Sequence, residues 1–427
     1  MEKLKKSLNE INYIWIIMIL IYIFVGGLFL LYSKYTKFSL VNYANRFYII
    51  NIITFILCIM NYILKKNFGL VDIIIIVLML IAMIVTYFSD YRKISLFGHT
   101  TRCEGMITLI VYYLLFILST FIEEKDKKKI IKSVLIFGIL NVAIGILQEL
   151  KIIPGLTEKY AKGIVGNSNF YSTQNIIWLS LSLGLFIFSK NWLYFILVLV
   201  FSIGLSIGGA MSCFVGLFCV LISILFIIIY NRKNINLKQS IKKYIFSIGL
   251  IFTIVIIISS LIDSKLTKDI KKLIFQSNDV LIKHNFEDNY GTNRMFIWKR
   301  TIPKIKENLL IGVGIDCFRY AFKPLLIYKG KIVSKAHNEY LQYLITEGIF
   351  CLIFYLLLLI VCIYNNFKRI KKEENYTSID YSVLFCVIGY ITQAFFNISV
   401  IRVAPLFYII LGLCYKRKNK ALKLNKK

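Results

Sequence analysis

The sequence predicts an all-α, polytopic membrane protein with about twelve transmembrane helices. Of its 427 residues, 58% are hydrophobic, and the mean hydropathy is +0.72. Soluble domains are about 45–50% apolar. Long apolar runs recur along the chain, and a helix needs about 20 such residues to cross a bilayer core. These runs are continuous rather than alternating, which excludes a transmembrane β-barrel.

The apolar runs define twelve expected spans within a single integral membrane domain over residues 1–427. They are 13–33, 47–64, 70–88, 106–122, 131–149, 172–188, 192–205, 207–230, 244–262, 349–364, 381–397 and 402–415. The first run is too long for the apolar core of a signal peptide and has no small-residue cleavage site, so we expect it to remain as a span.

Basic residues in every second connection predict the orientation of the spans. The residues are Lys3, Lys5, Lys6, Lys65, Lys66, Lys125, Lys127–Lys129, Arg232, Lys233, Lys242, Lys243, Lys368, Arg369, Lys371, Lys372 and the tail KRKNKALKLNKK. With an even number of spans, all of them face the cytoplasm, and so do both termini. We therefore interpret the net charge of +30 as contact with anionic membrane lipids of the plasma membrane, and expect no nucleic acid partner.

One long polar segment, residues 263–348, is expected on the opposite, extracytoplasmic side. It is far longer than the about 15 residues beyond which a loop is usually functional. It begins with an amphipathic helical pattern, DSKLTKDIKKLIFQSNDVLIKHNF. All three histidines of the chain, His99, His284 and His337, are predicted to lie on this side.

The middle of this segment has the spacing of a short helix followed by a turn. Arg294 and Trp298 are four residues apart and would share one helix face. Pro303 should bend or end that helix. Gly312 and Gly314 predict a tight turn, because glycine tolerates positive φ and close backbone approach. By itself, Arg294 could equally be an ordinary surface arginine.

The end of the segment places a histidine at the start of a span. If Asn338 is the N-cap of the following helix, His337 sits at its positive end, which disfavours the imidazolium form. A neutral imidazole near pH 7 can act as a general base. The plainer interpretation is an exposed loop histidine. Gly348 predicts a break between a short helix over 339–347 and the next span.

Two further arginines belong to the same side. Arg102 lies just before the fourth span, and Arg402 lies in the last outer turn. Arginine forks bind phosphate oxygens in a bidentate manner, so several of them in one pocket would suit a lipid pyrophosphate. Whether they converge is open at this point. Neither a paired-cysteine motif nor a His–Cys cluster occurs, so no metal is expected.

The stretches GTNRMFIWKRTIPKIKENLLIGVGIDCFRYAF and AHNEYLQYLITEGIF resemble the signature of the O-antigen ligase and O-antigen polymerase superfamily. The residues that carry this resemblance are Arg294, Trp298, Gly312, Gly314, His337, Asn338, Leu341, Gln342, Glu347 and Gly348. Weaker similarities occur in LFGHTTRCEG, IGILQEL and GIVGNSNF, so that most of the chain is touched.

The resemblance implies a membrane glycosyltransferase, needing neither metal nor other cofactor, at the outer face of the plasma membrane. It would move a glycan from an undecaprenyl-pyrophosphate-linked donor onto the hydroxyl of a glycan, lipid or protein acceptor. His337 would be the catalytic base, and Arg294, with Arg102, would bind the pyrophosphate. The further candidates for substrate binding are Asn338, Trp298 and Arg402. Ligase and polymerase activities share the motif and both stay open.

One departure from the family pattern stands out. Many members carry a Ser-Arg pair at the outer end of a middle span, where this chain has Gly208–Gly209 in LSIGGAMSCFVGL. One anion-binding group is therefore absent from that position, which keeps an inactive scaffold among the alternatives. A transporter is the other alternative, although charges in the middle of spans are nearly absent and no internal repeat is found.

Overall fold

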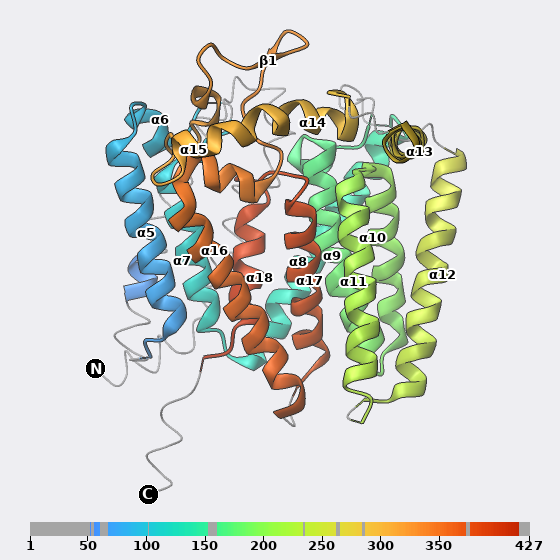
Figure 1. Ribbon diagram of the computed structural model, residues 1–427. Coiled ribbons are helices and arrows are strands. Elements are labelled where there is room, and N and C mark those ends of the chain that lie inside the picture. The colour runs from blue at the N-terminus through green and yellow to red at the C-terminus, as the bar shows by residue number, and fades with distance from the viewer. Residues whose placement is uncertain are drawn as a thin grey trace, which may run out of the picture.

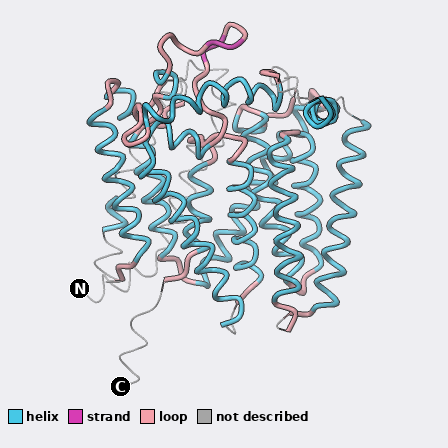
Figure 2. The backbone as a smooth tube through the Cα atoms, viewed as in Figure 1, coloured by secondary structure: helices cyan, strands magenta, loops and turns pink. Residues whose placement is uncertain are grey.

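The computed structural model describes residues 52, 55–59, 67–100, 102–152, 160–233, 235–261, 265–283, 287–372 and 376–417. The expected span 13–33 and most of 47–64 lie outside the described residues, as does His284. Within the described residues the protein is almost entirely helical (Figures 1 and 2). This confirms the all-α fold class; the total of twelve spans stays a prediction.

Among the described residues, ten helices form an upright bundle, and each overlaps one of the expected spans from 70–88 onward (Figure 1). They are α5 (Leu70–Phe88), α7 (Met106–Thr120), α8 (Glu124–Glu149), α9 (Ser168–Phe188), α10 (Phe195–Gly208), α11 (Met211–Tyr230), α12 (Leu237–Leu261), α16 (Glu339–Lys372), α17 (Ser378–Ala394) and α18 (Ala404–Cys414). Among the described residues, six candidate membrane spans meet both length and hydropathy requirements: α5, α8, α9, α11, α12 and α16.

The bundle buries its most polar candidate span and exposes its most apolar surfaces. The whole candidate span in α9 is buried, and α9 packs against α10, α11 and α17. In contrast, α12 exposes large apolar side chains, including Phe252 (66%) and Leu261 (77%). Apolar side chains on the outside of a bundle are stable when lipid rather than water surrounds them. The exposed surface thus supports a membrane protein.

One end of the bundle holds two buried ion-pair groups. Arg417, just beyond α18, donates to Asp72 at the start of α5 at 2.6 Å. Nearby in the fold, Asp380 of α17 lies 3.2 Å from Arg369 of α16 and 3.5 Å from Lys127 of α8. The first described bundle helix therefore begins, and the last one ends, at the same end. The orientation of that end toward the cytoplasm remains a prediction.

The segment predicted to be extracytoplasmic covers the opposite end of the bundle (Figures 1 and 2). Its elements are α13 (Lys265–Lys283), α14 (Tyr290–Thr301), the 3₁₀ turn η4 (Ile302–Lys304), α15 (Ile305–Asn308), η5 (Phe318–Ala321) and a hairpin of β1 (Ile327–Tyr328) and β2 (Lys331–Ile332). The antiparallel strands pair Ile327 with Ile332. The same end carries α6 (Arg92–Phe97). Shorter turns elsewhere are η2 (Gly163–Val165) and η3 (Trp192–Tyr194).

The expected amphipathic helix is α13, and the helical pattern of α14 gives way to the 3₁₀ turn at Pro303, as predicted. The glycine turn then docks on the first part of α16. Gly312 has φ +76°, and a Cβ there would lie 2.4 Å from the carbonyl carbon of Thr346. Gly348 has φ +84° and interrupts α16, as predicted. A Cβ at Gly348 would lie 2.2 Å from the oxygen of Leu310, so only glycine allows this close approach.

Candidate active site

His337 lies at the end of the bundle covered by the long segment, immediately before α16. Asn338 is the N-cap of this helix, because its Oδ1 accepts a hydrogen bond from the backbone N–H of Leu341 at 3.0 Å. This confirms the predicted cap. It also means that the amide oxygen of Asn338 is occupied by the helix. The backbone of His337 has φ +52°, a left-handed conformation that is uncommon for a residue other than glycine. Its imidazole is half-buried, and neither ring nitrogen has a hydrogen-bond partner among the described residues.

The surroundings of His337 keep its imidazole neutral. Burial lowers the pKa of His337 to about 4, and the positive charges of Arg294, Arg102 and Lys335 lower it in the same direction. Contacts place the three residues in one neighbourhood: Trp298, one turn after Arg294, donates to the backbone next to His337, and Lys335, two residues before His337, pairs with Glu104, two residues after Arg102. A neutral ring with both nitrogens unpaired can accept a proton from a substrate hydroxyl.

Arg294 is held firmly by the backbone around it. Its Nε and Nη2 donate to the carbonyl oxygen of Phe396 at 2.9 and 2.6 Å, and its Nη1 donates to the oxygen of Gly291 at 2.9 Å and to the hydroxyl of Thr292. A guanidinium has five N–H donors, so one remains for a ligand. Arg294 therefore provides a fixed positive charge, and it has too few free N–H groups for bidentate binding.

Arg102 is the arginine with donors to spare. Its buried Nε has no hydrogen-bond partner, and its guanidinium lies over the ring of Phe170, 5.8 Å from the centroid. A buried donor without a partner is costly, and a bound anion would satisfy it. Sequence reasoning made Arg294 the main pyrophosphate ligand and Arg102 its helper. The free donors of Arg102 instead favour Arg102 for direct contacts with a pyrophosphate, with Arg294 as the helper.

Trp298 and Arg402 make structural contacts near the site. The indole Nε1 of Trp298 donates to the backbone oxygen of Ala336 at 3.0 Å, directly before His337. Its ring lies against Phe395 and Phe396, the latter being the residue that holds Arg294, so the two α14 side chains share a face as predicted. Arg402 donates to the oxygen of Val165, in the turn η2.

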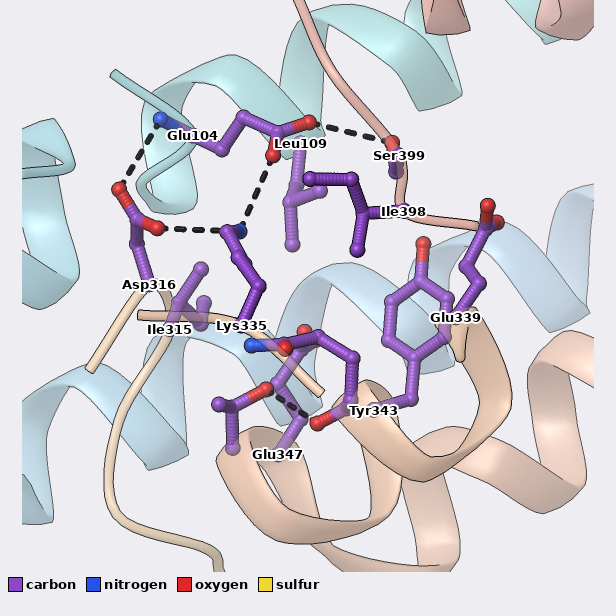
Figure 3. Close-up of a pocket in the computed structure, with 12 residues that line it drawn as sticks. Glu104, Leu109, Ile315, Asp316, Lys335, Glu339, Tyr343, Glu347, Ile398 and Ser399 are labelled. Carbon is purple, nitrogen blue, oxygen red and sulfur yellow. Dashed lines mark hydrogen bonds and ion pairs between the residues drawn. The ribbon is translucent and has the colours of Figure 1, made fainter. Parts of the chain in front are cut away.

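A buried cluster of three charged residues lies beside this site, around a cavity of about 30 Å³ (Figure 3). The Nζ of Lys335 lies 3.1 Å from Glu104 Oε2 and 3.0 Å from Asp316 Oδ1. The other oxygen of Glu104 accepts from the hydroxyl of Ser399 at 3.1 Å. Gln342 and Glu339 are also among the residues that line the cavity.

The geometry can be compared with known proteins. Residues 176–356 match the family model described as O-antigen ligase. This match supports the resemblance to the O-antigen ligase superfamily over the middle of the chain. This match contains Arg294, Trp298, His337 and Asn338, whereas Arg102 and Arg402 lie outside the matched residues. No curated protein matches the chain.

The O-antigen ligase signature has its one departure at Gly208–Gly209, and packing explains why no side chain stands there. Gly208 ends α10 against α9, and a Cβ at this position would lie 2.4 Å from the hydroxyl oxygen of Ser172. Gly209 has φ +63°, and the next N–H, of Ala210, donates to the same hydroxyl at 3.2 Å. An arginine does not fit this arrangement, so this position provides no positive charge.

Sequence reasoning did not identify Lys335, Glu104 or Asp316. Only Asp316, a single charge within the stretch IGVGIDCF, offered a signal, since isolated charges next to membrane spans are rarely accidental; Glu104 and Lys335 stand among other polar and charged residues. Their pairing was not visible, because Glu104 and Lys335 are 231 residues apart in the chain.

Proposed function

We propose that this protein is a membrane glycosyltransferase that moves a glycan from an undecaprenyl-pyrophosphate-linked donor onto an acceptor hydroxyl at the outer face of the plasma membrane. The observation that supports the proposal is that contacts link the segments of His337, Arg294 and Arg102 at one end of the bundle, in a chain whose residues 176–356 match the O-antigen ligase family model. A neutral base and fixed cations are the two features that this transfer requires.

In the proposed step, an acceptor hydroxyl gives its proton to a ring nitrogen of His337 as its oxygen attacks the anomeric carbon of the donor sugar. The bond between this carbon and the pyrophosphate oxygen breaks, and undecaprenyl pyrophosphate leaves as an anion. Positioned base catalysis of this kind contributes roughly 10²–10⁴-fold in rate. The imidazolium then loses the proton to water, because its low pKa makes it a strong acid.

The two arginines would stabilise the leaving group in different ways. Arg102 would donate its unpaired N–H groups to the pyrophosphate oxygens, and Arg294 would add a positive charge that the backbone has already fixed in place. Preorganised donors aimed at developing negative charge contribute roughly 3–4 kcal/mol each. The energy of the reaction comes from the activated donor.

The proposal covers ligase and polymerase activities, which differ in the acceptor. A ligase would use another lipid or a protein, and a polymerase would use a second copy of the lipid-linked glycan. Both reactions place the same donor pyrophosphate beside the same base. Purified protein offered each acceptor in turn would separate the two activities.

The test is glycan transfer by purified protein in liposomes, with an undecaprenyl-pyrophosphate-linked glycan as donor. His337→Ala should abolish the product, while His99→Ala, a histidine at the same end of the bundle, should retain it. An unchanged product with His337→Ala would remove His337 from the mechanism. Movement of the glycan across sealed vesicles without any product would favour a transporter instead.

A second experiment tests the arginines and the orientation. Arg102→Lys keeps the positive charge but loses the fork, so we expect a raised KM for the donor; full activity would exclude bidentate recognition. Ser334→Cys should react with an impermeant thiol reagent added to intact cells, since Ser334 is partly exposed and lies three residues before His337. Reaction only after the cytoplasmic side is opened would invert the proposed topology.

A further inference from the structure

The buried cluster of Lys335, Glu104 and Asp316 joins three parts of the chain that are distant in sequence. All three residues are at most 5% exposed. Besides the pair with Lys335, Asp316 uses its Oδ2 to accept from the backbone N–H groups of His99 and Glu104, at 2.7 and 3.4 Å. Figure 3 shows the lysine between the two carboxylates. The loop before α7, the glycine turn and the residues before α16 are thus fixed to one another.

This cluster depends on all of its members. Burial lowers the pKa of Lys335, but Asp316 and Glu104 outweigh this and raise it above its ordinary value, so the lysine stays charged. Removing one partner of a buried ion pair leaves an uncompensated charge, which is strongly destabilising. The arrangement is therefore rigid, and small changes in it are unfavourable.

Two of the fixed segments carry the proposed site residues. Lys335 stands two residues before His337, and Glu104 stands two residues after Arg102. Between Lys335 and His337, the backbone of Ala336 is held at both ends: its N–H donates to Gln342 Oε1 at 2.9 Å, and its oxygen accepts from Trp298 Nε1 at 3.0 Å.

The conformation of His337 requires such support. A left-handed backbone is unfavourable for a residue with a side chain, and such a conformation persists only where the surroundings enforce it. Asn338 fixes the chain after His337 by capping α16, and Lys335 anchors it before. Because the ammonium group of Lys335 is paired with Glu104 and Asp316, its effect would pass through His337.

We propose that Lys335, held by Glu104 and Asp316, is a positioning residue that fixes the His337 backbone and the Arg102 loop in one working arrangement. This inference rests on the proposed function. The charged groups that act on His337 are Arg294 from α14, Arg102 from the loop before α7 and Lys335 from its own segment.

The carboxylates around the site are engaged elsewhere. Glu104 and Asp316 pair with Lys335, and Glu339 accepts hydrogen bonds from the hydroxyls of Tyr355 and Tyr390 at 2.7 and 3.1 Å. Loss of the lysine charge would therefore make the neighbourhood of His337 less positive. The pKa of His337 should then rise in Lys335→Met but not in Glu104→Gln, which loosens the same cluster and keeps the lysine charge.

The test uses the full chain in liposomes with the same lipid-linked donor, and compares Lys335→Met and Glu104→Gln with Lys331→Met. Lys331 is an exposed lysine of the hairpin in the same segment and provides the matched control. The kcat and the pH dependence of kcat/KM are measured for each. We expect Lys335→Met to lower kcat by about 10–100-fold, the loss typical of a misplaced catalytic group, and to move the acid limb of the pH profile upward.

Glu104→Gln should lower kcat less, because Asp316 still pairs with Lys335, and should leave the acid limb in place, because the lysine charge remains. Lys331→Met should behave as the wild type. If the wild type is active and both cluster variants match it in kcat and pH profile, the inference is overturned and the proposed function stands. If Lys335→Met does not accumulate in membranes, an unchanged kcat in Glu104→Gln would overturn it. A wild type that transfers no glycan overturns the proposed function and the inference together.

Discussion

The acid limb of the pH profile should lie near pH 4 rather than near the ordinary pKa of histidine. The perturbation is a change of pH from 7.5 to 5.5 on the unmodified protein. Burial and the charges of Arg294, Arg102 and Lys335 lower the pKa of His337 to about 4. In the proposed mechanism His337 accepts a proton only in its neutral form, so activity should persist into mildly acidic solution.

The magnitude follows from the two pKa values. At pH 5.5, an imidazole with a pKa of about 4 is almost entirely neutral, whereas one with the ordinary value of 6.5 is neutral in about a tenth of the molecules. The two cases therefore differ about tenfold in the active fraction at pH 5.5 and hardly at pH 7.5. Below pH 4 activity should fall in either case.

The assay measures kcat/KM at donor concentrations far below KM, because this quantity reports the pKa of the free enzyme. Purified protein in liposomes is incubated with lipid-linked glycan between pH 3.5 and 8, with each sample returned to pH 7.5 to show that activity recovers. A loss that recovers reports titration, and one that does not reports unfolding. A recoverable tenfold fall between pH 7.5 and 5.5 would refute the neutral, charge-surrounded histidine.

Three more predictions concern the framework of the site. Gly348→Ala should destabilise the protein by about 1–3 kcal/mol, because the φ of +84° and ψ of 178° at this position suit only glycine. The thermal midpoint of unfolding in detergent measures this loss, and an unchanged midpoint would contradict the turn. Asp72→Asn leaves Arg417 buried with a neutral partner, so the free energy of unfolding should fall by about 3–5 kcal/mol and the same midpoint should fall with it. A change no larger than that caused by replacing an exposed acidic residue would argue against a buried pair. Trp298→Phe keeps the ring but loses the donor to Ala336, so kcat should fall about three- to tenfold, equivalent to one hydrogen bond; wild-type kcat would show that this bond does not matter.

The helices were predictable because apolar length is a local property. Every expected span from 70–88 onward overlaps a helix, and the position of Gly208–Gly209 does separate α10 from α11. What apolar runs do not reveal is which helix is central. The candidate span in α9 has the lowest hydropathy of the six, and its polar side chains, such as Asn175 and Ser180, are buried between helices instead of facing lipid.

The site was predictable where it depends on near neighbours in the chain. The cap at Asn338, the interruption at Gly348 and the shared face of Arg294 and Trp298 each involve residues at most a few positions apart. Contacts across the chain were not predictable. The backbone oxygen of Phe396, 102 residues away, occupies much of the guanidinium of Arg294, and this changed the expected division of work between the arginines.

The shortness of α7 and α18 determines how deep the chemistry takes place. Both helices reach from the neighbourhood of the site to the end where Arg417 lies, yet they have 15 and 11 residues. At 1.5 Å per residue they rise only about 22 and 16 Å, against a hydrocarbon core of about 30 Å. With the Arg417 end at one face of such a core, the ends of α7 and α18 near His337 would lie below the opposite headgroups. Under the proposed function, a lipid-linked donor would keep its tail among the acyl chains while its diphosphate reaches this depth, and the acceptor sugar would have to reach down to meet it.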